Sequence, residues 1–136
     1  MKVGEVMTAD VELAAPDDTV QTAAKLMADS GAGALPVGEN DRLVGMVTDR
    51  DIVIRGIADG SDPHAVKVGD IASRDVVTVR PDDDLDEAMR LMAQHQVRRL
   101  PVVDDGHLVG VVATADVAQE AKEKDVGHVV EEISKP

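Results

Sequence analysis

Two short stretches of the sequence combine an aliphatic strand pattern with polar side chains that could bind a ligand. They are LVGMVTDRD, residues 43–51, and LVGVVATAD, residues 108–116. Each ends on an aspartate, Asp51 in the first stretch and Asp116 in the second. A carboxylate can accept both hydroxyls of a ribose cis-diol, and each charge-assisted hydrogen bond of this kind contributes about 1.5–3 kcal/mol. For a ligand that contains ribose, which the family resemblance described below implies, Asp51 and Asp116 are the candidate diol acceptors.

Thr48 lies three residues before Asp51, and this spacing has two interpretations. Both side chains can face a ligand, or they can form a capping box in which each satisfies a backbone amide at a helix start. The second stretch departs from the pattern, because Ala113 stands at the position of Thr48 and Thr114 follows it. We expect Asp116 to keep the diol acceptor while its site binds more weakly or differently.

Arg98 and Arg99 are the candidate phosphate donors, because the forked guanidinium can bond two phosphate oxygens at once. They directly precede a Leu-Pro-Val stretch, residues 100–102, and the first copy has Gly33 and Ala34 at the same place. The alternative is surface charge paired with the many acidic side chains. We favour a phosphate role for at least one arginine, since solubility explains such a pair poorly in a chain of net charge −13.

Aliphatic side chains are the only candidates for a slot that would hold a flat base, because the chain contains no Phe, Tyr or Trp. Val11 and Val76 begin the predicted first strand of each copy, and Val47 and Val112 end a later one. Burial in a core explains each of these valines equally well.

The two stretches belong to a longer internal repeat with an offset of 65 positions, running without insertion from about residue 6 to 117. At this offset Pro16 coincides with Pro81 and Pro36 with Pro101. Such self-similarity is the sequence signature of repeat architecture. We predict the divisions as a first repeat over 1–58, a linker over 59–70, a second repeat over 71–124 and a tail over 125–136. The tail has apolar residues at roughly helical spacing and packs either on the body or on a partner chain.

Periodicity predicts strand, helix, strand, strand and helix in each repeat. In the first repeat these are 11–15, 19–31, 34–37, 43–47 and 49–58, and in the second 76–80, 82–95, 100–103, 108–112 and 114–124. An apolar stripe on the first helix of each repeat should face the core. Its members are Val20, Ala23, Ala24 and Met27 in the first repeat and Leu85, Ala88, Met89 and Met92 in the second.

Composition narrows the functional classes. The absence of cysteine excludes disulfides and thiolate chemistry, and the four histidines are too scattered for a dedicated metal site. With 14 basic and 27 acidic side chains, the protein repels polyanions, so nucleic acid is not an expected partner. The sequence has no apolar run long enough for a membrane segment, and its N-terminus lacks the apolar part of a signal peptide. We therefore expect a cytoplasmic protein. No catalytic motif is present, so an enzyme is not expected.

These features resemble the tandem cystathionine-β-synthase (CBS) domain pair, or Bateman module. The resemblance covers nearly the whole chain and rests on the Leu-Pro-Val strand and on a Gly-aliphatic-aliphatic-X-X-X-Asp junction in each copy. Two segments, TDRDIVIRGIADGSDP and QHQVRRLPV, also resemble the small stand-alone CBS-pair proteins of actinobacteria, such as the mycobacterial hypoxic-response protein.

The resemblance implies an α/β (α+β) fold of two βαββα repeats related by a pseudo-twofold axis. It implies two clefts between the repeats for AMP, ADP, ATP, S-adenosylmethionine or NAD, with none obligatory, and a basic pair such as Arg98-Arg99 that meets phosphate. It further implies a homodimer that regulates an unknown protein partner, here in a stress response. The alternative is a constitutive dimeric interaction module whose clefts are degenerate and bind nothing.

Overall fold

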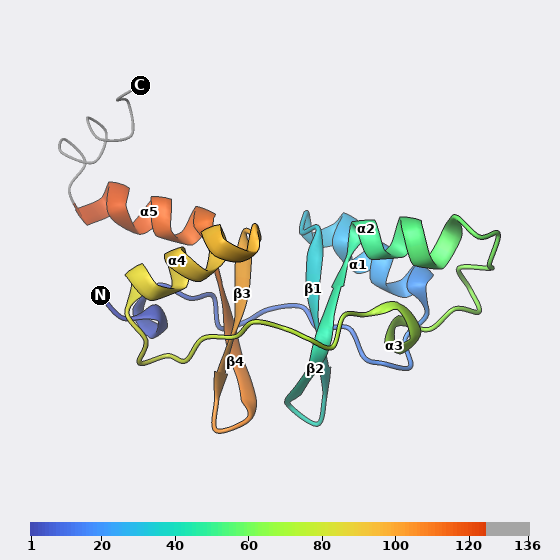
Figure 1. The fold of residues 1–136 in the computed structure, drawn as a ribbon, viewed down its shortest axis with the longest axis horizontal. Helices are drawn as coiled ribbons and strands as arrows, with labels where there is room; N and C mark the ends of the chain where they lie inside the picture. The colour runs from blue at the N-terminus through green and yellow to red at the C-terminus, as the bar shows by residue number, and fades with distance from the viewer. Residues whose placement is uncertain (125–136) are drawn as a thin grey trace. The chain divides into compact units, whose positions relative to one another are not determined.

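Helices and short antiparallel strands build two units in the computed structural model, which describes residues 1–124 (Figure 1). The first-repeat unit comprises residues 11–76 and 105–108, and the second-repeat unit comprises residues 1–10, 77–104 and 109–124. The predicted mixed helix and strand class is confirmed. The predicted tail at 125–136, with its apolar cluster, lies outside the described residues.

The first-repeat unit contains one hairpin with helices beside it (Figure 1). Its strands pair antiparallel, with Leu35 opposite Val47. Thr19 caps the first helix by accepting a hydrogen bond from the amide of Thr22 at 3.2 Å, and Gly31 ends it at φ 73°, in agreement with the helix predicted over 19–31. The elements are α1 (Val20–Ser30), β1 (Ala34–Glu39), β2 (Arg42–Thr48), α2 (Asp49–Asp51), the π-helical η2 (Ile52–Ile57) and α3 (Val68–Ile71).

The second repeat has its own hairpin, β3 and β4, whose residues 105–108 are grouped with the first-repeat unit. Asp105 and Gly106 have positive φ values of 51° and 80° in the turn between the two strands of this hairpin, and Asn40 and Asp41 have 55° and 66° in the turn of the first hairpin. Two successive positive φ values are the mark of a type I′ turn, which suits the twist of a hairpin. The elements are η1 (Val3–Glu5), α4 (Leu85–His95), β3 (Arg99–Asp104), β4 (His107–Ala113) and α5 (Thr114–Lys124).

The N-terminal segment and its counterpart at the 65-residue offset each pack in the unit formed mainly by the other repeat. Val3 is fully buried with the second-repeat core, and Val68, its counterpart at the 65-residue offset, is fully buried with the first-repeat core. Their amides donate to matching carbonyls, Val3 to Asp83 at 2.9 Å and Val68 to Asp18 at 2.8 Å. The segment 59–70, predicted as a linker, thus contributes Val68 to the core of the first-repeat unit.

The predicted first strands, 11–15 and 76–80, form only single parallel bridges, Ala14 with Val37 and Val79 with Val102. Ala14 donates to the carbonyl of Pro36 at 3.0 Å and accepts from Gly38 at 2.9 Å. The next bonds would need amide hydrogens from Pro16 on one side and Pro36 on the other, and proline has none. Pro81 and Pro101 impose the same limit on the second copy, so the strand prediction was wrong for these segments.

The core of each unit is purely aliphatic among the described residues. Three of the four predicted stripe positions on α1 are buried, but Ala24 is exposed. On α4 the matching position, Met89, is 46% exposed, while Ala88 and Met92 are buried. The stripe prediction was therefore wrong at the same position in both repeats. Leu26 and Leu91 pack against the two cores instead.

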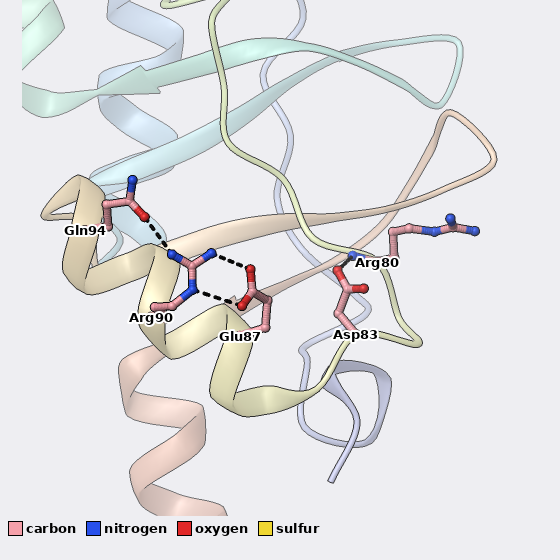
Figure 2. A network of polar contacts seen from close by, with 5 residues as sticks. All are labelled: Arg80, Asp83, Glu87, Arg90 and Gln94. Atoms are coloured by element: carbon pink, nitrogen blue, oxygen red, sulfur yellow. Dashed lines mark hydrogen bonds and ion pairs between the residues drawn. The ribbon is translucent and has the colours of Figure 1, made fainter.

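Polar side chains line the outer face of α4 (Figure 2). The Arg90 guanidinium donates to both carboxylate oxygens of Glu87, at 2.6 and 3.0 Å, and to Gln94 at 2.9 Å. This contact lowers the pKa of Glu87 and raises the pKa of Arg90. The Asp83 carboxylate in the same view accepts the backbone amide of Arg80 at 2.9 Å. Both contacts are exposed to solvent, so they shape the surface and add little to the core.

Candidate functional site

Thr48 and Asp51 form a complete capping box where β2 passes into α2. The Thr48 hydroxyl oxygen accepts the Asp51 amide at 3.0 Å, and Asp51 Oδ2 accepts the Thr48 amide at 2.9 Å. The capping interpretation of this pair is therefore confirmed. The box leaves Asp51 Oδ1 without a hydrogen bond to any described residue. Because the side chain is half-buried and held by one oxygen, the other oxygen is fixed in place and available to a ligand.

The second junction holds its aspartate differently. Asp116 Oδ2 accepts the amide of Ala113 at 3.0 Å, which repeats half of the capping box. Ala113 offers no hydroxyl in return, as the sequence indicates. Asp116 Oδ1 instead accepts the hydroxyl of Thr8, 3.4 Å away in the N-terminal segment. Both oxygens of the second candidate acceptor are therefore engaged within the second-repeat unit.

Thr8 was not singled out in the sequence, although the repeat contained a signal for it. At the 65-residue offset Thr8 coincides with Ser73, so both copies carry a hydroxyl just before the extended segment. Thr8 exchanges two backbone hydrogen bonds with Val111, both at 2.9 Å, and Ser73 exchanges two with Met46, also at 2.9 Å. A search for matched hydroxyl residues across the repeat would have found the pair.

The arginine pair lies beside the start of α5. The carbonyl of Arg98 accepts the amide of Thr114 at 2.9 Å, just as the carbonyl of Gly33 accepts that of Asp49 at 2.9 Å in the first repeat. Arg98 is exposed and Arg99 half-buried, and neither forms an ion pair with any side chain from residue 1 to 120. The structure thus gives no support to the alternative that these charges are paired with surface acids. Thr114 itself is exposed.

The valines proposed to line a base slot separate into two groups. Val47 and Val112 are both 0% exposed, so they belong to the core and have no surface to offer a ligand. Val11 and Val76 are half-buried and stand outside both core clusters. Both are part of the first-repeat unit, which also contains Asp51. Val11 and Val76 therefore stay candidates for apolar contact with a ligand.

An exposed aliphatic face distinguishes η2 from its counterpart. Val53, Ile54 and Ile57 are 54%, 52% and 47% exposed. At the 65-residue offset the sequence has Ala118, Gln119 and Lys122 in their place. This face follows directly on Asp51 in the chain, and its apolar character is confined to the first repeat.

Two further features bear on ligand classes. Within residues 1–124, the structure shows no group of three or more His, Cys, Asp or Glu side chains arranged to hold a metal ion. Within the same part of the chain, none of the helices combines the length and apolar character required to cross a bilayer.

Comparison with known proteins places both repeats in one family. The model of the CBS domain matches residues 3–56 and 68–123. The CBS domain-containing protein YhcV of Bacillus subtilis is 42% identical over 133 residues, which cover 97% of this chain and 94% of that protein. Hypoxic response protein 1 of Mycobacterium tuberculosis is 39% identical over 133 residues, covering 97% and 93% of the two chains. The predicted resemblance to the mycobacterial protein is confirmed.

Solved structures agree with this assignment. The crystal structure of Hypoxic Response Protein I with two coordinated zinc ions has a TM-score of 0.81 and 40% identity, over 88% of this chain and 98% of that one. The crystal structure of CBSX2 in complex with AMP has a TM-score of 0.78 and 30% identity, over 90% and 96%. These neighbours share the fold of this chain over most of its length.

Proposed function

Because this chain belongs to the CBS domain family and carries the domain twice, we propose that it is a regulatory module that binds an adenosine-type ligand and is not itself an enzyme. The ligand is an adenine nucleotide, S-adenosylmethionine or NAD, and its binding changes the affinity of the module for a protein partner. The AMP bound to CBSX2, a structural neighbour of 30% identity, supports this ligand class.

The single observation that carries the proposal is the orientation of Asp51. Its Oδ2 is fixed by the Thr48 amide at 2.9 Å, and its Oδ1 is left to accept a ribose hydroxyl. A carboxylate held in this way loses little freedom on binding, so a larger share of the interaction energy appears as affinity. Thr48 acts by orienting the carboxylate, and the half-buried Val11 and Val76 supply apolar contact for the base.

Arg98 and Arg99 are proposed as the donors for phosphate. Their guanidinium groups have no acidic partner among the described residues, so binding a phosphate breaks no ion pair. If this assignment holds, the affinity for AMP should exceed that for adenosine, and replacing both arginines with glutamine should remove most of the difference. Equal affinities in the unmodified protein would contradict the assignment.

Equilibrium dialysis tests the Asp51 site directly. The protein has no Trp, Tyr or Phe, so the ultraviolet absorbance of adenine reports the bound ligand with little interference. The panel contains AMP, ADP, ATP, S-adenosylmethionine and NAD. Asp51→Asn keeps an oxygen for the Thr48 amide but removes the charge, and it should weaken binding about tenfold or more. Asp49→Asn, two residues away and exposed, is the matched control and should bind normally.

A second candidate function follows from the exposed aliphatic face of Val53, Ile54 and Ile57. In this alternative the chain is a constitutive interaction module, in which this face mediates self-association or binds a partner and the junction aspartates serve only as caps. Absence of binding across the whole nucleotide panel would favour it. Sedimentation of the protein and of an Ile54→Glu variant would then show whether the face joins two copies of the chain.

A further inference from the structure

Both carboxylate oxygens of Asp116 accept hydrogen bonds from other residues of the chain. Its Oδ2 accepts the Ala113 amide at 3.0 Å and its Oδ1 accepts the Thr8 hydroxyl at 3.4 Å. A cis-diol donates two hydroxyls to a carboxylate, and at Asp116 it would have to compete with the Thr8 hydroxyl for the lone pairs of Oδ1, whereas Oδ1 of Asp51 accepts no hydrogen bond from a described residue. The second site therefore differs from the first in more than the missing hydroxyl at Ala113.

The backbone holds Thr8 in place for this contact. The two hydrogen bonds with Val111, both at 2.9 Å, fix residue 8 beside β4. Gly110 makes the approach possible, because a Cβ at that position would lie 2.7 Å from the Thr8 carbonyl oxygen. Thr8 is thus presented to Asp116 by the fold, although the hydroxyl contact itself is longer than an optimal O–H···O bond of about 2.7–2.8 Å.

Ser73 provides an internal control for this arrangement. It makes the same pair of backbone hydrogen bonds with Met46, and Gly45 allows the same close approach. Its hydroxyl nevertheless forms no hydrogen bond with Asp51, whose Oδ1 is unbonded among the described residues. The backbone is equivalent in the two copies, but the hydroxyl engages the carboxylate in only one of them.

We infer that Thr8 is a latch on the second ligand site: its hydroxyl competes for the Asp116 oxygen that a ribose diol needs, so the chain binds one diol ligand tightly, at Asp51, and a second one more weakly. The inference rests on the proposed function and adds the residue that sets its stoichiometry. A site that is open for only a fraction of the time binds with an affinity reduced by that fraction. Because the Thr8 contact is long, we expect the latch to reduce the affinity of the second site roughly tenfold and not to abolish it.

The test is the stoichiometry of AMP binding, measured by equilibrium dialysis on the full chain. Thr8→Val replaces the hydroxyl with a methyl group of nearly the same shape and keeps the backbone pairing. The unmodified protein should bind one AMP per chain with high affinity, lost in Asp51→Asn. Thr8→Val should bind a second AMP roughly tenfold more tightly than the unmodified protein does, and adding Asp116→Asn should remove that gain. Ser73→Ala, the matched control, should leave both sites unchanged.

Each other outcome separates this inference from the proposed function. One AMP in both the unmodified protein and Thr8→Val, or two of equal affinity in both, overturns the latch and leaves the nucleotide function standing. Weaker binding in Thr8→Val overturns it as well, since Thr8 would then contact the ligand. Binding only in Thr8→Val, lost with Asp116→Asn, supports the latch and removes Asp51 as the site. No binding in either protein overturns both, and circular dichroism confirms that each variant is folded.

Discussion

The two strand-to-helix junctions share one backbone and differ in what holds the acidic side chain. In both, the first helical residue donates its amide to the carbonyl of the residue 16 positions earlier, at 2.9 Å. That carbonyl belongs to Gly33 in the first repeat and to Arg98 in the second. In the first, Asp51 is held by a reciprocal box with Thr48. In the second, Asp116 is held by the Ala113 amide and by Thr8. The backbone symmetry is thus preserved by main-chain bonds, which leaves the side chains free to give the two junctions different chemistry.

The largest expected change in stability comes from substituting the glycines that let the backbone at Ser73 and Thr8 approach the two hairpins. A Cβ at Gly45 would lie 2.5 Å from the carbonyl oxygen of Ser73, and one at Gly110 would lie 2.7 Å from that of Thr8. Gly45→Ala and Gly110→Ala should each lower the free energy of unfolding by about 3 kcal/mol, because they overpack the contact and weaken its two backbone hydrogen bonds. Urea unfolding followed by far-ultraviolet circular dichroism measures both.

Gly38→Ala is the matched control for these glycines. Its Cβ would meet its nearest neighbours at 3.5 and 3.6 Å, which is ordinary van der Waals contact, and it also lies in a hairpin strand. The variant should change stability by less than about 1 kcal/mol. If Gly38→Ala proved as destabilising as Gly45→Ala, the cost at Gly45 and Gly110 would not come from the close approach of the Ser73 and Thr8 backbone.

The segments around Val3 and Val68, each of which packs in the unit formed mainly by the other repeat, should contribute equally to the stability of the two units. Val3 and Val68 are fully buried, each in the unit of the other repeat. Val3→Ala and Val68→Ala should each cost about 2 kcal/mol, from the lost burial of two methyl groups and the cavity that remains. Val97→Ala, at a valine that is 40% exposed, should cost much less. A near-zero cost at Val3 alone would show that the exchange is one-sided.

Much of this architecture was predictable from the sequence, because the repeat and the periodic apolar residues act locally. The Thr19 cap, the Gly31 end of α1 and the two hairpins follow from side-chain and turn preferences within a few residues. The burial of Val3 in the second-repeat core and of Val68 in the first-repeat core could not be predicted from the sequence, because it depends on contacts between segments that are distant in the chain. The candidate residues Thr48 and Asp51 were found by spacing, whereas the Thr8 contact with Asp116 joins positions 108 residues apart.

A smaller effect tests the side-chain part of the comparison by exchanging the caps. Thr48→Ala removes the hydroxyl that accepts the Asp51 amide and should cost about 1 kcal/mol. Ala113→Thr restores the matching acceptor at the second junction and should stabilise the protein by up to about 1 kcal/mol. Thermal unfolding of both variants and of the double variant gives the two effects and their sum. A destabilising Ala113→Thr would show that the second junction has no room for a complete box.

The smallest effect concerns the helices that cover the two hairpins. At the 65-residue offset Lys25 on α1 coincides with Arg90 on α4. Lys25 meets Asp29 at 3.6 Å, whereas Arg90 grips both oxygens of Glu87 at 2.6 and 3.0 Å. Arg90 lowers the pKa of Glu87 in the folded protein, so this pair stabilises the fold above the unfolded pKa of the carboxyl group, about 4.3. The contribution is lost as the pH falls through the lower, folded value.

Glu87→Gln should therefore lower the melting temperature slightly at neutral pH, and the difference from the unmodified protein should vanish in acid and in about 1 M salt. Asp86→Asn, in the same first turn of α4, removes a charge of the same sign with no ion pair to Arg90. It reports the effect of charge at the helix start alone, which salt also screens. If both variants lost equal stability, the two-pronged contact with Arg90 would add nothing to the fold, and the two helices would be equivalent despite their different cations.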